Sequence, residues 1–128
     1  MTDTEKLRYA RNLLLTLHKS LIDFERAGYE NVHGKLNAGQ FLNVLLEDEN
    51  FAWLRKFSML IVEIDEMFDL KDGISDEMVS SNLRKIGELV GMQEEDEFFR
   101  AKYRNALQAD PEIAGTQAQL QGVLNIGK

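Results

Sequence analysis

Residues 51–70 read FAWLRKFSMLIVEIDEMFDL, and this stretch decides the fold. It holds the only tryptophan and more apolar residues than one face of a helix can carry. At 3.6 residues per turn, most of them fall on one wide arc, which we expect to face the core. This arc comprises Trp53, Leu54, Phe57, Leu60, Ile61, Ile64, Met67 and Phe68. The stretch therefore predicts a buried central helix.

Met59 and Val62 fall on the back of this helix, beside Arg55, Glu63 and Glu66. An apolar pair with charged neighbours predicts a second contact surface. In a two-fold dimer, each copy would bury the same strip against the other. Alternatively, the helix expected over residues 38–47 or the C-terminal helix could fold over the strip within one chain. We expect a homodimer, and a different protein stays open as a further partner.

The rest of the chain also has helical periodicity. It contains one proline and almost no alternation of polar and apolar residues. Apolar residues three or four apart predict a long first helix over residues 4–29. Capping signals then predict a short helix after Asn37 and Gln40, and another from Ser75 to Gly91. A fifth helix is expected over 93–108 and a sixth from Asp110-Pro111, with a frayed tail from Gly122.

Three of these helices each have a set of expected core residues. They are Phe41, Leu42, Leu45 and Leu46 in the short helix, Val79, Leu83, Ile86 and Val90 in the next, and Phe98, Phe99, Tyr103, Ala106 and Leu107 in the fifth. The sequence thus predicts an all-α fold, a single-domain antiparallel bundle of about four to six helices. It has a long N-terminal helix and a buried central helix.

The totals exclude several classes of protein. With 128 residues and 44% hydrophobic content, the chain fits one domain over residues 1–128. It has no cysteine, which excludes disulfides and thiolate sites and suits the cytoplasm. Residues 1–11 lack the basic start and apolar run that are typical of a signal peptide, and the strictly apolar runs, such as 59–62, are far too short to span a membrane. We expect no membrane partner.

The net charge is −7, and residues 65–128 hold 13 acidic against 7 basic side chains. Acidic runs such as residues 94–97 would repel a phosphate backbone, so we expect no nucleic-acid partner. We interpret that run as a solvated start of a helix rather than as a docking patch, because acidic groups are favourable at helix N-termini.

Arg11, His18 and Glu25 are spaced by seven residues and lie within the apolar arc of the first helix. Buried polar groups need partners, so one interpretation is a structural network with side chains such as Ser58, Asp65 or Tyr103. The other is a binding site for a small molecule or a metal, because the interiors of helical bundles can hold such sites. Neighbours in the row are about 10.5 Å apart along the axis and cannot bond one another directly.

The remaining candidate chemistry is weak. Glu30 and His33 form a single Glu-x-x-His, whereas di-iron bundles need two such motifs. A calcium loop around Gly73 fails, because its ligand positions would fall on Phe68, Leu70 and Val79. No nucleophile or phosphate-binding motif is present. We therefore assign no catalytic residue, metal ligand or cofactor, and expect that the protein is not an enzyme.

Three segments carry a resemblance: LHKSLIDFERAGYENVHG, FAWLRKFSMLIVEIDE and LQADPEIAG. Their marks are Glu25-Arg26, Tyr29-Glu30, His33-Gly34, residues 51–55, Ile64-Asp65-Glu66 and Asp110-Pro111. Together they resemble a family of small helical bacterial proteins to which no activity is assigned, over about residues 14–114. In that family a proline often follows the aspartate that matches Asp48, where this chain has Glu49. The resemblance implies a bacterial source and no particular function.

The function expected from these observations is a protein-protein interaction or regulatory module without enzymatic activity. Its interface would include Met59, Val62, Arg55 and Glu66. The alternative is a bundle that binds a small molecule or a metal through Arg11, His18 and Glu25.

Overall fold

The computed structural model describes residues 1–93 and 96–125. Over these residues the chain forms six α-helices, one short 3-10 helix and no strand. They are α1 (Asp3–His33), α2 (Ala38–Glu47), η1 (Glu49–Leu54), α3 (Arg55–Phe68), α4 (Asp76–Val90), α5 (Glu97–Ala109) and α6 (Pro111–Leu124). The expected all-α helical bundle with a long N-terminal helix is confirmed.

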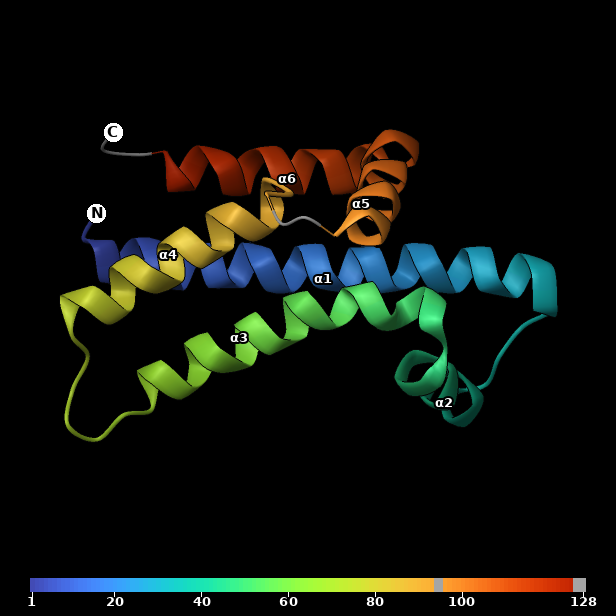
Figure 1. Ribbon diagram of the computed structural model, residues 1–128, viewed down its shortest axis with the longest axis horizontal. Helices are drawn as coiled ribbons and strands as arrows, with labels where there is room; N and C mark the ends of the chain where they lie inside the picture. Colours follow the sequence, from blue (N-terminus) through green and yellow to red (C-terminus); the bar gives the residue numbers. More distant parts are fainter. Residues whose placement is uncertain (94–95, 126–128) are drawn as a thin grey trace.

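Helix α1 runs the length of the molecule, and the other helices are arranged around it (Figure 1). Helix α3 runs back along one side of α1, and α6 runs back along another, so both are antiparallel to it. Helices α4 and η1 also pack against α1, whereas α2 lies beside its C-terminal end. The apolar stripe of α1 is completely buried: Leu7, Ala10, Leu14, Leu17 and Leu21.

Side chains at the helix starts explain where the helices begin. Asn37 and Gln40 form the expected capping box of α2. Ser75 accepts a backbone hydrogen bond at the start of α4, and Asp110 does the same at α6. Thr2 forms a further capping box at α1. Each cap satisfies a backbone N–H that has no partner inside its helix.

Two helix ends differ from the sequence prediction. The first helix continues to His33 instead of residue 29, and it stops where Gly34 takes a φ of 90°. Such a backbone angle favours glycine. The last helix continues through Gly122 to Leu124, so the expected fraying from Gly122 is wrong there. Residues 126–128 lie outside the described part.

Two helix starts also differ. The central stretch is not one α-helix, because Asp48 first caps the 3-10 turn η1, after which α3 begins at Arg55. The fifth helix begins at Glu97, since the capping carboxylate is that of Asp96, whose Oδ1 accepts from Phe99 N at 3.0 Å. This agrees with the interpretation of the acidic run as a helix start, although Glu94 and Glu95 lie outside the described residues.

The centre of the core is a cluster of four aromatic rings from η1, α3 and α5. Trp53, Phe57, Phe99 and Tyr103 have centroids 5.4–6.1 Å apart and are almost fully buried. The expected core arc of the central stretch is buried except at its end. There Phe68 is half-buried, and the guanidinium of Arg8 lies 4.0 Å from its ring centroid.

Three expected core residues lie on the surface. Leu42 and Leu46 of α2 are 54% and 58% exposed, and Phe98 of α5 is 48% exposed. Helix α2 sits at the end of the bundle and packs on one side only, through the partly buried Phe41 and Val44. The wide apolar face that the sequence indicates is therefore only partly covered.

Candidate functional site

We define the outer strip as Met59 and Val62 with their charged neighbours Arg55, Glu63 and Glu66 on α3. Met59 is 69% exposed and Val62 53%, whereas Leu60 and Ile61 between them are 7% and 6% exposed. Ser58, Met59, Val62, Glu63 and Glu66 line a shallow depression of about 300 Å³. The alternative in which α2 or the C-terminal helix covers the strip is therefore wrong. Within one chain the two apolar side chains face outward.

The charges of the outer strip differ in how they are paired. Glu63 forms an ion pair with Lys85 of α4, which links the two helices. Arg55 donates a hydrogen bond to the carbonyl oxygen of Leu46, at the end of α2. Across the described residues, neither Arg55 nor Glu66 forms an ion pair with an opposite charge. The strip thus carries one uncompensated charge of each sign.

Arg11 contacts Asp65 of α3, which is one of the three expected partners. Arg11 Nε and Nη2 each donate to a carboxylate oxygen at 2.8 Å, a bidentate pair that raises the pKa of the guanidinium. The two side chains are 25% and 46% exposed, so the pair lies at the surface and not in the interior. The other two expected partners are wrong: Ser58 donates to the carbonyl of Arg55, and Tyr103 donates to Gln117.

Glu25 is a buried carboxylate that contacts α5. It is 9% exposed, and its Oε2 lies 3.5 Å from Lys102 Nζ. Burial raises the pKa of Glu25, and the neighbouring Lys102 partly opposes that shift. The indole of Trp53 also acts to lower the pKa of Glu25, although its buried Nε1 has no hydrogen-bond partner among the described residues.

His18 contacts an aromatic ring of α3. Its imidazole stacks on Phe57, with centroids 6.2 Å apart and planes at 19°. Burial lowers the pKa of His18, because the charged form would lose its hydration. The row Arg11, His18 and Glu25 thus makes three separate contacts with α3 and α5, and not one shared network.

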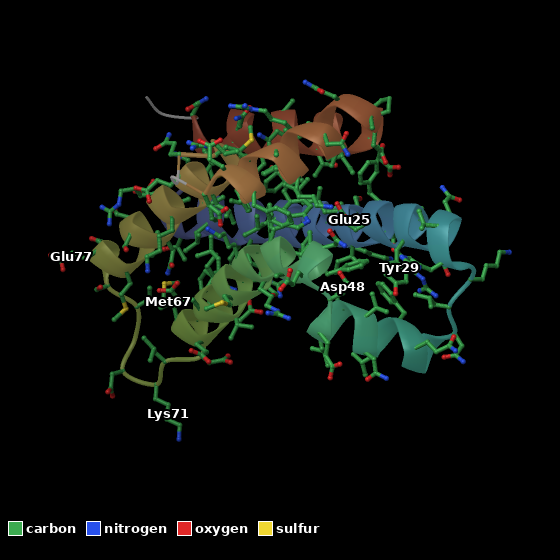
Figure 2. The ribbon with its side chains drawn as sticks, turned by 45° about the vertical axis from the view of Figure 1, so that its right-hand side comes forward. Glu25, Tyr29, Asp48, Met67, Lys71 and Glu77 are labelled. Atoms are coloured by element: carbon green, nitrogen blue, oxygen red, sulfur yellow. The ribbon has the colours of Figure 1, made fainter. Side chains whose placement is uncertain are left out.

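A cleft of about 540 Å³ opens between α1, η1 and α5 beside Glu25. Tyr29, His33, Asn50 and Lys102 also line it. Figure 2 shows Glu25 and Tyr29 along the same helix, with Tyr29 nearer to α2. Arg11 and His18 do not line this cleft, so the row predicted from the sequence contributes only one of its three residues to it.

A second groove, of about 870 Å³, lies between α3 and α4 and has an apolar centre of Met67, Leu70 and Met78. In Figure 2, Met67 lies between the two helices, Lys71 lies in the connection that follows α3, and Glu77 lies at the start of α4. Asn82 is buried beneath this groove: its Nδ2 donates to Met67 Sδ at 3.3 Å, while its Oδ1 has no hydrogen-bond partner in the part of the chain that the structure describes.

Sequence reasoning missed two of these polar side chains. Asn82 lies three residues after Val79 and four before Ile86, so helical spacing already places it on the apolar stripe of α4. Lys102 carried no such signal, because a lysine next to a buried tyrosine is equally compatible with full exposure. Only the packing of α5 against α1 brings it to Glu25.

The Glu-x-x-His motif has a structural role. Glu30 Oε2 accepts from the backbone N of Leu36 at 2.8 Å and lies 3.6 Å from Arg26 Nε, and both contacts order the turn into α2. The ring of His33 lies against Tyr29, with centroids 4.3 Å apart. Within residues 1–93 and 96–125, no group of three or more potential ligands could hold a metal ion.

None of the helices described is both long enough and apolar enough to cross a bilayer. No protein-family model matches the chain, and no curated protein or solved structure matches it significantly.

Proposed function

We propose that the protein is a non-enzymatic interaction module that assembles through the outer strip of α3, with a second copy of the chain as its main partner. One observation carries this proposal: Met59 and Val62 are 69% and 53% exposed on a helix whose other face is fully used by the core. Exposed apolar side chains that adjoin one another and have a charged rim are typical of interaction sites.

A two-fold dimer suits this strip better than a ligand site does. The depression along it is shallow and open, whereas small-molecule sites bury most of the surface of their ligand. A helix from a second copy would cover the same residues without a cavity, since isologous contacts use one patch twice. The resemblance to small helical bacterial proteins supports a bacterial source, and the absence of cysteine supports a cytoplasmic location.

Sedimentation velocity tests the proposal. The wild type should sediment as a dimer, and the Met59→Glu, Val62→Glu double variant as a folded monomer, because acidic side chains of the two copies would face one another in the buried contact. Val32→Glu is the matched control, since Val32 is 78% exposed at the far end of α1 and should leave the dimer intact. A wild type that stays monomeric at high concentration overturns the proposal.

One observation favours a second function, the binding of a small polar molecule. The carboxylate of Glu25 is buried at a cleft of about 540 Å³ and is only loosely held by Lys102. A native mass spectrum of the purified protein would show such a molecule as a bound mass, which Glu25→Gln should remove. A spectrum without any bound mass, together with a clean metal analysis, would leave the interaction role alone.

A further inference from the structure

We infer that two copies pair their outer strips in an antiparallel register that sets Arg55 of each chain against Glu66 of the partner subunit. This inference rests on the proposed function, because it specifies how the same strip meets its copy. Three observations support it. Arg55, Met59, Val62 and Glu66 are symmetrically spaced along α3. Neither of the two charged members has an ion-pair partner among the described residues, and two exposed leucines lie at the ends of the strip.

The spacing of the strip is symmetric along α3. Arg55, Met59, Val62 and Glu66 follow one another at intervals of four, three and four residues, and at 100° per residue they fall within about 60° of arc. The pair Met59 and Val62 and the pair Arg55 and Glu66 share one midpoint, between residues 60 and 61. A two-fold axis through that midpoint therefore sets Met59 against Val62 of the partner, and Arg55 against Glu66 of the partner.

The charges favour this register over the parallel one. In the antiparallel pairing both ends of the strip join an arginine to a glutamate, whereas a parallel pairing would set Arg55 against a second arginine. Glu63 is already paired with Lys85, while Arg55 and Glu66 have no opposite charge among the described residues. Charged residues that flank an apolar seam commonly set the orientation of paired helices.

Two exposed leucines extend the apolar contact beyond α3. Leu46 is 58% exposed, and its carbonyl oxygen accepts from Arg55, which places it at one end of the strip. Leu70, 46% exposed, lines the same groove as Glu66 at the other end. In the antiparallel register Leu46 of one copy approaches Leu70 of the partner. The two leucines add to the buried area of the contact, and stable interfaces bury roughly 1,200–2,000 Å² in total.

Charge reversal tests the pairing. In an Arg55→Glu dimer two glutamates face each other at both ends, and in a Glu66→Arg dimer two arginines do, so each should dimerise about tenfold more weakly than the wild type. An equimolar mixture of the two variants should form a heterodimer within about threefold of the wild-type dissociation constant, because both opposite-charge contacts return. A mixture as weak as either variant alone overturns the pairing.

Cysteine crosslinking tests the direction without altering Arg55. The chain has no native cysteine, so Met59→Cys and Val62→Cys each provide a single thiol. In a glutathione redox buffer, a mixture of the two variants should form mainly the crosslink between positions 59 and 62. Crosslinks that join each variant mainly to itself would indicate a parallel register. That result together with a wild-type dimer overturns this inference and leaves the proposed function standing, whereas a monomeric wild type overturns both.

Discussion

At the scale of single residues, Phe57 is the core side chain that packs against four other rings. It is fully buried, and its ring lies 5.4–6.2 Å from those of His18, Trp53, Phe99 and Tyr103. These neighbours come from α1, η1 and α5, so the ring joins three elements to α3. Because these four rings are rigid, they cannot easily move into the cavity that a smaller side chain would leave at position 57.

Phe57→Ala should therefore destabilise the protein by about 3 to 5 kcal/mol, the range expected when a buried aromatic ring is truncated in a rigid core. The free energy of unfolding from guanidinium denaturation at pH 7 measures this. Phe98→Ala, at a half-exposed ring, is the control and should cost less than about 1 kcal/mol. Equal losses for the two variants would contradict the central position of Phe57.

His18 makes stability depend on pH. Burial holds its pKa in the folded protein below the value of about 6.5 for a free histidine. As the pH falls through that range, the unfolded chain takes up a proton that the folded protein resists. The contribution of neutral His18 to the free energy of unfolding is therefore fully present above the pKa that this histidine has in the unfolded chain. It is lost as the pH falls toward the lower pKa in the folded protein. We expect the wild type to lose stability relative to His18→Leu as the pH falls below about 7.

Denaturation curves of the two proteins across this range measure the difference. Glu25 acts in the opposite sense: its raised pKa favours the protonated folded form, so it adds stability as the pH falls. It is present in both proteins, and its effect therefore cancels in the comparison. His33→Leu, at an exposed position, serves as a control for the loss of any histidine. Parallel pH profiles of wild type and His18→Leu would contradict the burial of His18.

At the scale of helices, the bidentate pair of Arg11 and Asp65 joins α1 to α3. Both side chains are partly exposed, which limits its strength, but the planar guanidinium meets the carboxylate in fixed geometry. A double-mutant cycle with Arg11→Met and Asp65→Asn should give a coupling energy of about 0.5 to 1 kcal/mol. The cycle of Arg84 and Glu88, a more exposed pair within α4, should give a smaller value. A coupling of zero for the first cycle would show that the pair does not hold the two helices together.

Helix α2 should be the least stable of the helices. None of its side chains is fully buried, and Phe41 is held partly by the guanidinium of Arg26, 4.4 Å from its ring centroid. Helices with few buried contacts open locally at low free energy. Amide hydrogen exchange should be faster in α2 than in α1 or α6, and Arg26→Ala should accelerate exchange in α2 without changing α6. Protection in α2 equal to that in the middle of α1 would contradict this.

At the scale of the whole molecule, the sequence predicts where the helices lie better than it predicts which of their faces are buried. Spacing and capping residues predicted the core arc of the central stretch and the helix starts at Asn37, Ser75 and Asp110, because those signals are local, whereas the 3-10 turn before Arg55 was missed. Periodicity shows which residues share a face, but not whether another element lies over it. For this reason the sequence predicts Phe98 in the core. It also leaves open whether a second copy or another helix of the same chain covers Met59. Such questions depend on packing between helices that are distant in the sequence.

The central place of α1 also has a consequence for biosynthesis. Its buried stripe makes the most extensive contact with α6, which begins at Pro111, 78 positions after His33. At translation rates of about 5 to 20 residues per second, roughly 4 to 16 s separate the synthesis of these two points. During that interval the leucines of α1 belong to a nascent chain that does not yet include their main cover. Ribosome-bound chains that stop before Pro111 should therefore recruit chaperones more strongly than chains that extend past α6.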